Sequence, residues 1–195
     1  MQNQRLRLSR GVVPIRGDDG EAPEPLRGYK TTQSSSPRFT TVFDIAASAD
    51  EIPSLFTDLV DLLLPPTAYL ILEVSWQDPT TLYLSRFMAR SALQAALREV
   101  ERHLVEDGMT AFGLAWYDET SLAEVFVDEH KTIRVFTSRP EVVRERLWVS
   151  QFAEDHALAL LSQGAHAHLA LPDTMDLLTT KLVQALEMRA QPAVH

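Results

Sequence analysis

The chain has 195 residues, a length typical of one domain, and 45% of them are hydrophobic, which suffices for a core. It has no cysteine, which excludes disulfides, thiolate metal sites and a cysteine nucleophile and is typical of a reducing, cytoplasmic location. The formal net charge of −9 disfavours nucleic acid and anionic membranes as partners, and no apolar run reaches the roughly 20 residues of a transmembrane helix.

Residues 1–37 are predicted to form a disordered tail. Glycine, proline, serine and charged residues dominate residues 17–37, so few side chains there can offset the entropy that ordering would cost. The partly alternating stretch from Arg5 to Ile15 could add a strand to the body or to a partner, or simply move with the tail. Most acidic residues lie in residues 38–195, which we interpret as a single acidic α+β domain.

Strands and helices are predicted to alternate through the first part of this domain. One helix begins at a capping box formed by Ser48 and Glu51 and ends at Pro65, and a second ends at Gly108. Aromatic and β-branched runs predict the strands, which are Arg38–Ala46, Thr67–Trp76, Thr81–Phe87 and Thr110–Tyr117. The resulting β-α-β-β-α-β order is that of the ferredoxin-like fold, in which two helices cover one face of an antiparallel sheet.

A C-terminal β-hairpin and further helices are predicted to extend this sheet. The hairpin strands are Leu122–Asp128 and Thr132–Thr137. The register that pairs Val125 with Val135 places the aliphatic residues of both strands on one face. The opposite face then carries Glu124, Phe126, Arg134 and Phe136. Two helices follow, one beginning near Pro140 and one near Pro172.

Five residues of the predicted sheet are candidates for an interaction site: Glu73, Glu124, Phe126, Arg134 and Phe136. Glu73 interrupts an apolar strand, so burial without a partner would raise its pKa, as a general acid or base requires. The favoured explanation is exposure to solvent or an ion pair with a nearby arginine. We expect Glu124 and Arg134 to form a cross-strand ion pair. We expect the C-terminal helices to cover Phe126 and Phe136, which would otherwise form an exposed aromatic patch.

The segment His166-Ala167-His168 is the most suggestive short pattern for metal binding. On a strand, residues two apart share a face, so both imidazoles could bind one metal ion, and His156 could complete the set. No established metal-binding motif accompanies these histidines. The competing interpretation is a pair of surface histidines in a loop after Gly164, and no cofactor is expected.

The sequence favours an interaction protein over an enzyme, because it contains no nucleotide-binding, phosphate-binding or serine-hydrolase motif. The leading hypothesis is a non-catalytic regulatory module, such as an adaptor, inhibitor or immunity-type protein, that binds a basic protein partner through an acidic surface. The outer faces of the two helices could provide that surface. The alternative is a small-ligand-binding protein, or a hydrolytic or metal-dependent enzyme that uses Glu73 or the histidines His156, His166 and His168. The sheet edges could also pair two copies into a homodimer.

Overall fold

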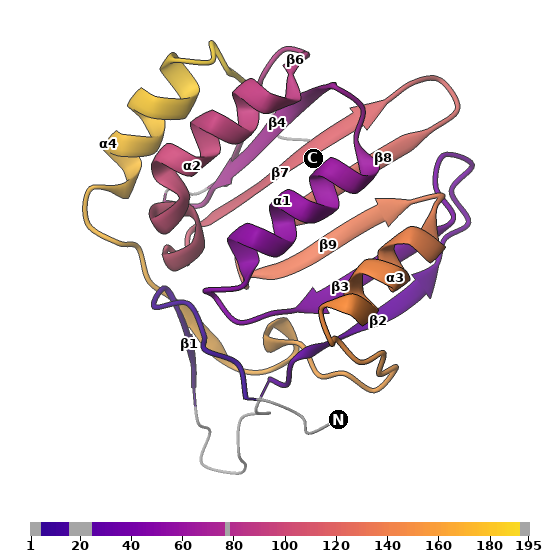
Figure 1. The fold of residues 1–195 in the computed structure, drawn as a ribbon. Helices are drawn as coiled ribbons and strands as arrows, with labels where there is room; N and C mark the ends of the chain where they lie inside the picture. The colour runs from indigo at the N-terminus through magenta and orange to yellow at the C-terminus, as the bar shows by residue number, and fades with distance from the viewer. Residues whose placement is uncertain (1–4, 16–24, 77–78, 192–195) are drawn as a thin grey trace.

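The computed structural model describes residues 5–15, 25–76 and 79–191, which form a mixed α+β fold (Figure 1). The strands are β1 (Val12–Pro14), β2 (Gly28–Gln33), β3 (Thr41–Ala46), β4 (Thr67–Val74), β5 (Thr81–Leu84), β6 (Met88–Ala89), β7 (Thr110–Tyr117), β8 (Leu122–Val127), β9 (Thr132–Thr137), β10 (His166–His168) and β11 (Arg189–Ala190). The α-helices are α1 (Ile52–Leu63), α2 (Arg90–Glu106), α3 (Pro140–Val149) and α4 (Thr174–Leu178). A 3₁₀ turn follows at Leu161–Gln163, and a π-helical stretch, Thr179–Gln184, continues α4.

One large antiparallel sheet forms the main layer. It has nine strands in the order β11-β5-β4-β7-β8-β9-β3-β2, with β6 paired to β4 outside that path. The remaining two strands, β1 and β10, form a separate ribbon. In the part of the chain that the structure describes, no helix is long and apolar enough to cross a membrane.

All four helices lie on the same face of the sheet (Figure 1). Alternate strand residues such as Leu72, Leu114 and Val135 point toward the helices and are fully buried. The helices supply matching apolar residues, including Leu59 from α1 and Leu178 from α4. Each such side chain stabilises the fold by about 1.5–3 kcal/mol. This core leaves the opposite face of the sheet without a helix among the described residues.

The strand order does not show the ferredoxin-like arrangement. In that arrangement the first and third strands of the β-α-β-β-α-β unit lie side by side, whereas β3 and β5 are separated here by β9, β8, β7 and β4. Two placements produce this order: β4 pairs with one side of β7, and β7 continues through tight turns into β8 and β9 on its other side. This meander occupies the sheet position next to β7, so β3 pairs with β9 at its far end.

Parts of the predicted tail, residues 1–37, are ordered within the fold. Strand β2 pairs with β3 along its whole length, and the buried ring of Tyr29 lies 5.9 Å from the ring of Phe43. Arg27 donates hydrogen bonds to the carbonyl oxygens of Ser150 and Gln151 after α3, at 2.7 and 2.8 Å. These long-range contacts supply the stabilisation that the local composition lacks, so the ordered domain begins before Arg38. Residues 1–4 and 16–24 of the predicted tail lie outside the described residues.

Candidate functional site

The five predicted interaction residues all lie on the sheet face opposite the helices, which we call the open face. Directly paired residues of an antiparallel sheet share a face. Glu124 pairs with Ala115 and with Phe136, and Phe126 pairs with Arg134. Ala115 and Ala111 pair in turn with Tyr69 and Glu73 of β4, which alternate with the buried leucines. The structure therefore brings residues from β4, β8 and β9 onto one surface.

Aromatic side chains line the open face. The rings of Tyr69, Phe87 and Tyr117 pack against one another with centroid separations of 5.2–5.6 Å, and 46% of Phe87 and 47% of Tyr117 remain exposed. The ring of Phe136 meets that of Phe39 edge-on at 5.3 Å. Phe126 lies over Gly113, where a Cβ atom would approach the phenyl ring to 2.7 Å. Because glycine has no Cβ atom, the Phe126 ring can pack directly against the backbone of β7 at Gly113.

Two expectations for this face are wrong. The C-terminal helices do not cover Phe126 and Phe136, because α3 and α4 pack on the other side of the sheet, where Leu147 and Leu178 are fully buried. Both phenylalanines are only partly buried. The second wrong expectation is the ion pair between Glu124 and Arg134, which the described residues do not form.

The arginine instead bonds to an aspartate on the next strand. Arg134 Nε donates to Asp44 Oδ1 at 3.1 Å, since Asp44 is its direct partner on β3, whereas Glu124 faces Phe136. Arg134 Nε also lies 4.0 Å from Asp128 Oδ2. The arginine charge is therefore already matched by neighbouring carboxylates and is not available to Glu124.

The carboxylates of Glu73 and Glu124 have no ion pair or side-chain hydrogen bond with the described residues. Burial raises the pKa of Glu124 to about 7, and the charge of Glu73 adds to the effect. Burial also raises the pKa of Glu73, as do the charges of Glu129 and Asp128. Burial, followed by the charge of Glu124, raises the pKa of Tyr69 to about 12. The centre of the open face is thus a half-buried acidic spot among aromatic rings.

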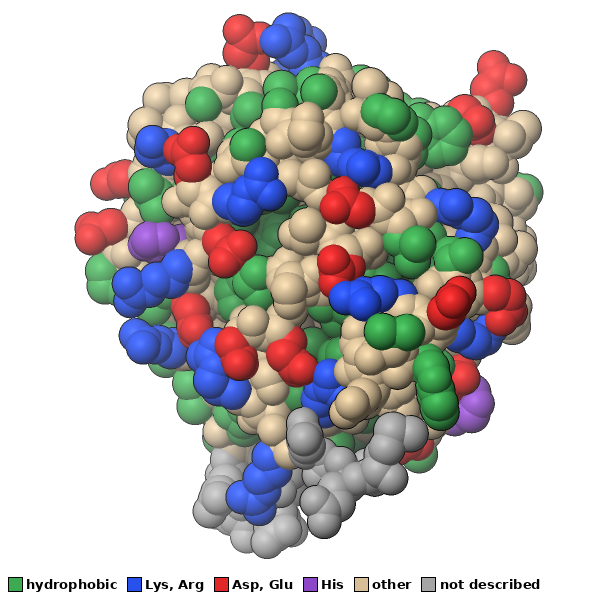
Figure 2. All heavy atoms as spheres, viewed as in Figure 1, with side chains coloured by type: hydrophobic (Ala, Val, Ile, Leu, Met, Phe, Trp, Pro, Cys, Tyr) green, Lys and Arg blue, Asp and Glu red, His purple; other side chains and the backbone are tan. Residues whose placement is uncertain are grey.

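Four of the acidic residues on α1 and α2 form ion pairs with basic side chains. Asp58 pairs with Arg146, Asp61 with Arg90, Glu99 with Lys181 and Glu106 with Arg7. Figure 2 shows acidic and basic side chains interspersed across this side of the molecule. The predicted acidic surface on these helices is therefore partly neutralised, whereas Glu101 of α2 is exposed.

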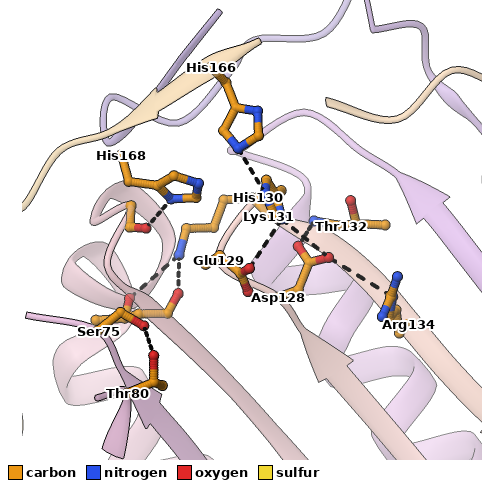
Figure 3. A network of polar contacts seen from close by, with 12 residues as sticks. Ser75, Thr80, Asp128, Glu129, His130, Lys131, Thr132, Arg134, His166 and His168 are labelled. Carbon is orange, nitrogen blue, oxygen red and sulfur yellow. Dashed lines mark hydrogen bonds and ion pairs between the residues drawn. The ribbon is translucent and has the colours of Figure 1, made fainter. Parts of the chain in front are cut away.

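A second feature lies at one end of the sheet, where three imidazoles meet (Figure 3). His166 and His168 lie on β10 and point to the same side, as the motif predicts, and His130 in the turn between β8 and β9 faces them. One ring nitrogen from each of the three lies within 4.8 Å of the others. The third predicted candidate, His156, is exposed and does not belong to this group. Sequence reasoning missed His130, because no local pattern shows that a hairpin turn meets a strand from another part of the chain.

Each of the three imidazoles has its Nδ1 atom near an oxygen acceptor. The Nδ1 atom of His166 lies 2.7 Å from the carbonyl oxygen of Gly164, and that of His168 lies 2.5 Å from the carbonyl oxygen of Gly108. The Nδ1 atom of His130 lies 3.5 Å from Glu129 and 3.8 Å from Asp128. The Asp128 carboxylate raises the pKa of His130, against the effect of burial. This arrangement leaves the Nε2 atoms to face one another, with those of His130 and His166 at 2.9 Å.

Comparison with protein-family models, curated proteins and solved structures finds no match to this chain.

Buried contacts hold the turn that carries His130. Asp128 Oδ1 accepts a hydrogen bond from the backbone N–H of Thr132 at 2.9 Å. The Nζ atom of Lys131 is buried beneath the turn and donates to the carbonyl oxygens of Leu104 and Thr110 at 3.0 and 2.6 Å. Burial lowers the pKa of Lys131 to about 8. Because the neighbours of His130 are anchored on both sides, the turn presents its imidazole in a defined position.

Proposed function

We propose that this chain is an interaction module that binds a basic protein partner on its open face. The observation that carries this proposal is the position of Glu73 and Glu124, two half-buried carboxylates without a countercharge from the described residues. A large, partly apolar sheet face without a covering layer is the kind of surface that marks a protein interaction site. Aromatic residues such as Tyr69, Phe126 and Phe136 are typical anchors of interfaces.

The chemistry of this face favours an arginine or lysine side chain as the central contact from the partner. A guanidinium or ammonium group placed between Glu73 and Glu124 would donate hydrogen bonds to carboxylates that the domain itself leaves unpaired. The flanking rings of Tyr69 and Tyr117 can accept the cationic group or its aliphatic stem. The rest of the chain carries a net negative charge, which would steer such a partner toward the protein.

A second copy of the chain fits this face less well than a basic partner. A two-fold homodimer places the same surface patch of each copy against the other. The glutamates of both copies would then meet in a region that excludes water, and their mutual repulsion would oppose association above about pH 7, where Glu124 is ionised. We therefore assign the open face to a different protein.

Site-specific photo-crosslinking tests the proposal. We would place p-benzoylphenylalanine at position 126 or 136, both on the open face, and at position 148 as a matched control on α3, where Trp148 is 70% exposed. After irradiation of cells that produce the protein, we expect positions 126 and 136, and not 148, to form an adduct with a basic protein. That protein would then be purified and its affinity for this chain measured by calorimetry.

Binding measurements with this chain and the purified partner protein test the role of the two glutamates. Glu73→Gln combined with Glu124→Gln is expected to weaken binding at least about tenfold, since hydrogen bonds to charged groups contribute about 1.5–3 kcal/mol each. Rising salt concentration is expected to slow association. An adduct with a second copy, an adduct that forms equally at position 148, or an affinity unchanged by the double substitution would each overturn the proposal.

A further inference from the structure

The three-histidine cluster lies in the β8–β9 turn and strand β10, and it points to a ligand of a different class. We propose that His130, His166 and His168 bind one divalent transition metal ion, zinc(II) by preference, and leave a fourth coordination position for water or another small ligand. The cluster combines residues from two regions of the chain, the β8–β9 turn and strand β10.

The spacing of the nitrogens fits one metal ion. Zinc–nitrogen bonds of about 2.0–2.1 Å in a tetrahedron hold ligand nitrogens about 3.3 Å apart. The two Nε2 atoms of His130 and His166 are 2.9 Å apart, and all three ligand atoms lie within 4.8 Å. Small rotations of the side chains would therefore bring all three within bonding distance of one ion.

The hydrogen bonds around the cluster select the atoms that would bind the ion. A carbonyl oxygen only accepts hydrogen bonds, so the Nδ1 atoms of His166 and His168 must carry protons toward Gly164 and Gly108. Their Nε2 atoms, when neutral, then carry lone pairs directed into the cluster. Histidines that ligate metals almost always donate the other ring N–H to a carbonyl or carboxylate in this way.

Hydrogen bonds among the described residues do not satisfy every ring nitrogen of the cluster. His130 can donate Nε2–H to His166, and a charged His130 can at the same time donate Nδ1–H to the carboxylates of Asp128 and Glu129. In either state the Nε2 lone pair of His168 has no donor among the described residues. A metal ion on the three Nε2 atoms gives this nitrogen a partner as well, while His130 donates Nδ1–H to those acids.

The number of ligands indicates an open site. Structural zinc sites have four protein ligands, whereas sites that keep a fourth position for water or substrate have three. The described residues contribute three histidines and no further carboxylate to the group. Imidazole ligands suit zinc, copper, nickel and iron, and exclude calcium and magnesium as the preferred ions. A zinc ion held here would lower the pKa of a water molecule in the fourth position.

Two backbone hydrogen bonds position the end of β10 beside Gly108 and Gly11. The N–H of Gly108 donates to the carbonyl oxygen of Leu169 at 3.0 Å, and the N–H of Leu169 donates to that of Gly11 at 2.7 Å. Gly11 and Gly108 approach so closely that a Cβ atom on Gly108 would lie 1.9 Å from the Gly11 oxygen. This contact lays the β1–β10 ribbon against the end of α2, where His168 reaches the Gly108 carbonyl.

Metal titration of the full chain, freed of any affinity tag, tests the proposal. We expect calorimetry with zinc chloride to give one ion per chain, and binding more than about 100-fold weaker for His130→Ala, His166→Ala or His168→Ala. The matched controls are His103→Ala and His156→Ala, two histidines outside the cluster, which should bind zinc as the parent does. Zinc should raise the melting temperature of the parent and controls but not of the cluster variants.

Cobalt(II) gives a readout that does not depend on affinity. The parent chain with cobalt is expected to show the strong visible absorption of a tetrahedral ion, and azide should alter that spectrum by entering the fourth position. If a cluster variant fails to fold, the corresponding His→Gln variant replaces it in every measurement. Less than about one fifth of an ion per chain, equal binding by the cluster variants, or loss of binding in His156→Ala would overturn the site. A cobalt spectrum insensitive to azide would overturn the open position.

Discussion

Replacing Glu124 with glutamine should make the protein more stable, and the gain should grow with pH. Glu124 has an ordinary pKa near 4.5 when unfolded and about 7 in the fold, because the open face buries it beside Glu73. A folded-state pKa above the unfolded one means that the native state holds the proton more tightly. The contribution of Glu124 to the free energy of unfolding is therefore largest below pH 4.5, falls as pH rises toward 7, and levels off above it.

The size of this effect follows from the pKa difference. Each pKa unit corresponds to about 1.4 kcal/mol, so the shift of Glu124 corresponds to about 3 kcal/mol at most, and partial solvent access reduces it to about 2 kcal/mol. Glutamine keeps the shape of the side chain but has no charge at any pH. The stability difference between Glu124→Gln and the parent should therefore be small near pH 4.5 and reach about 2 kcal/mol near pH 8.

Urea unfolding, followed by circular dichroism at several pH values, measures this difference. Glu119→Gln is the matched control, since Glu119 is an exposed glutamate in the turn between β7 and β8. If the gain from Glu124→Gln were the same near pH 5 and near pH 8, the Glu124 carboxylate would be hydrated in solution. The argument for an unpaired buried acid on the open face would then fail.

Three other substitutions test the packing. Arg27→Ala should lower the free energy of unfolding, measured by urea unfolding, by about 2 kcal/mol. The substitution removes the hydrogen bonds to the carbonyl oxygens of Ser150 and Gln151 after α3. An unchanged free energy of unfolding would mean that residues 25–33 contribute little to the fold. Gly113→Val should cost at least about 1–3 kcal/mol, because its Cβ would meet both the Phe126 ring and the carbonyl oxygen of Val125 at 2.7 Å. Adding Phe126→Ala relieves only the ring contact and should recover part of the loss. Gly108→Ala should separate the ribbon from α2, seen as faster proteolysis near the N-terminus; a cleavage rate equal to that of the parent would contradict it.

The sequence predicts most strands of the sheet but not their neighbours. Strand β9 spans Thr132–Thr137 as its alternation predicts, and the register that pairs Val125 with Val135 is confirmed. Both follow from local patterns and a short turn. The pairing of β3 with β9 joins segments about ninety residues apart in the sequence. No single motif in the sequence specifies this pairing, because it depends on many side chains. The ferredoxin-like order failed at this point.

The candidate sites show the same division between local and distant information. The alternation of the hairpin correctly places Glu124, Phe126 and Phe136 on one face. Which face the helices cover depends on the whole sheet, so the expected burial of the phenylalanines was wrong. Likewise the spacing of His166 and His168 predicts that they share a side, but their partner His130 comes from a turn that only the folded chain brings near.

The pairing of β3 with β9 also sets an order for folding during synthesis. Strand β3 leaves the ribosome well before its partner β9, which ends at Thr137. Strands β4, β5, β7, β8 and β9 follow one another with shorter connections, so they can assemble first at a smaller entropic cost of loop closure. Until then β2 and β3 form an exposed two-stranded hairpin, which is marginally stable by itself. Nascent chains are therefore most open to chaperones, and to mispairing with one another, during translation of the region between α1 and β9.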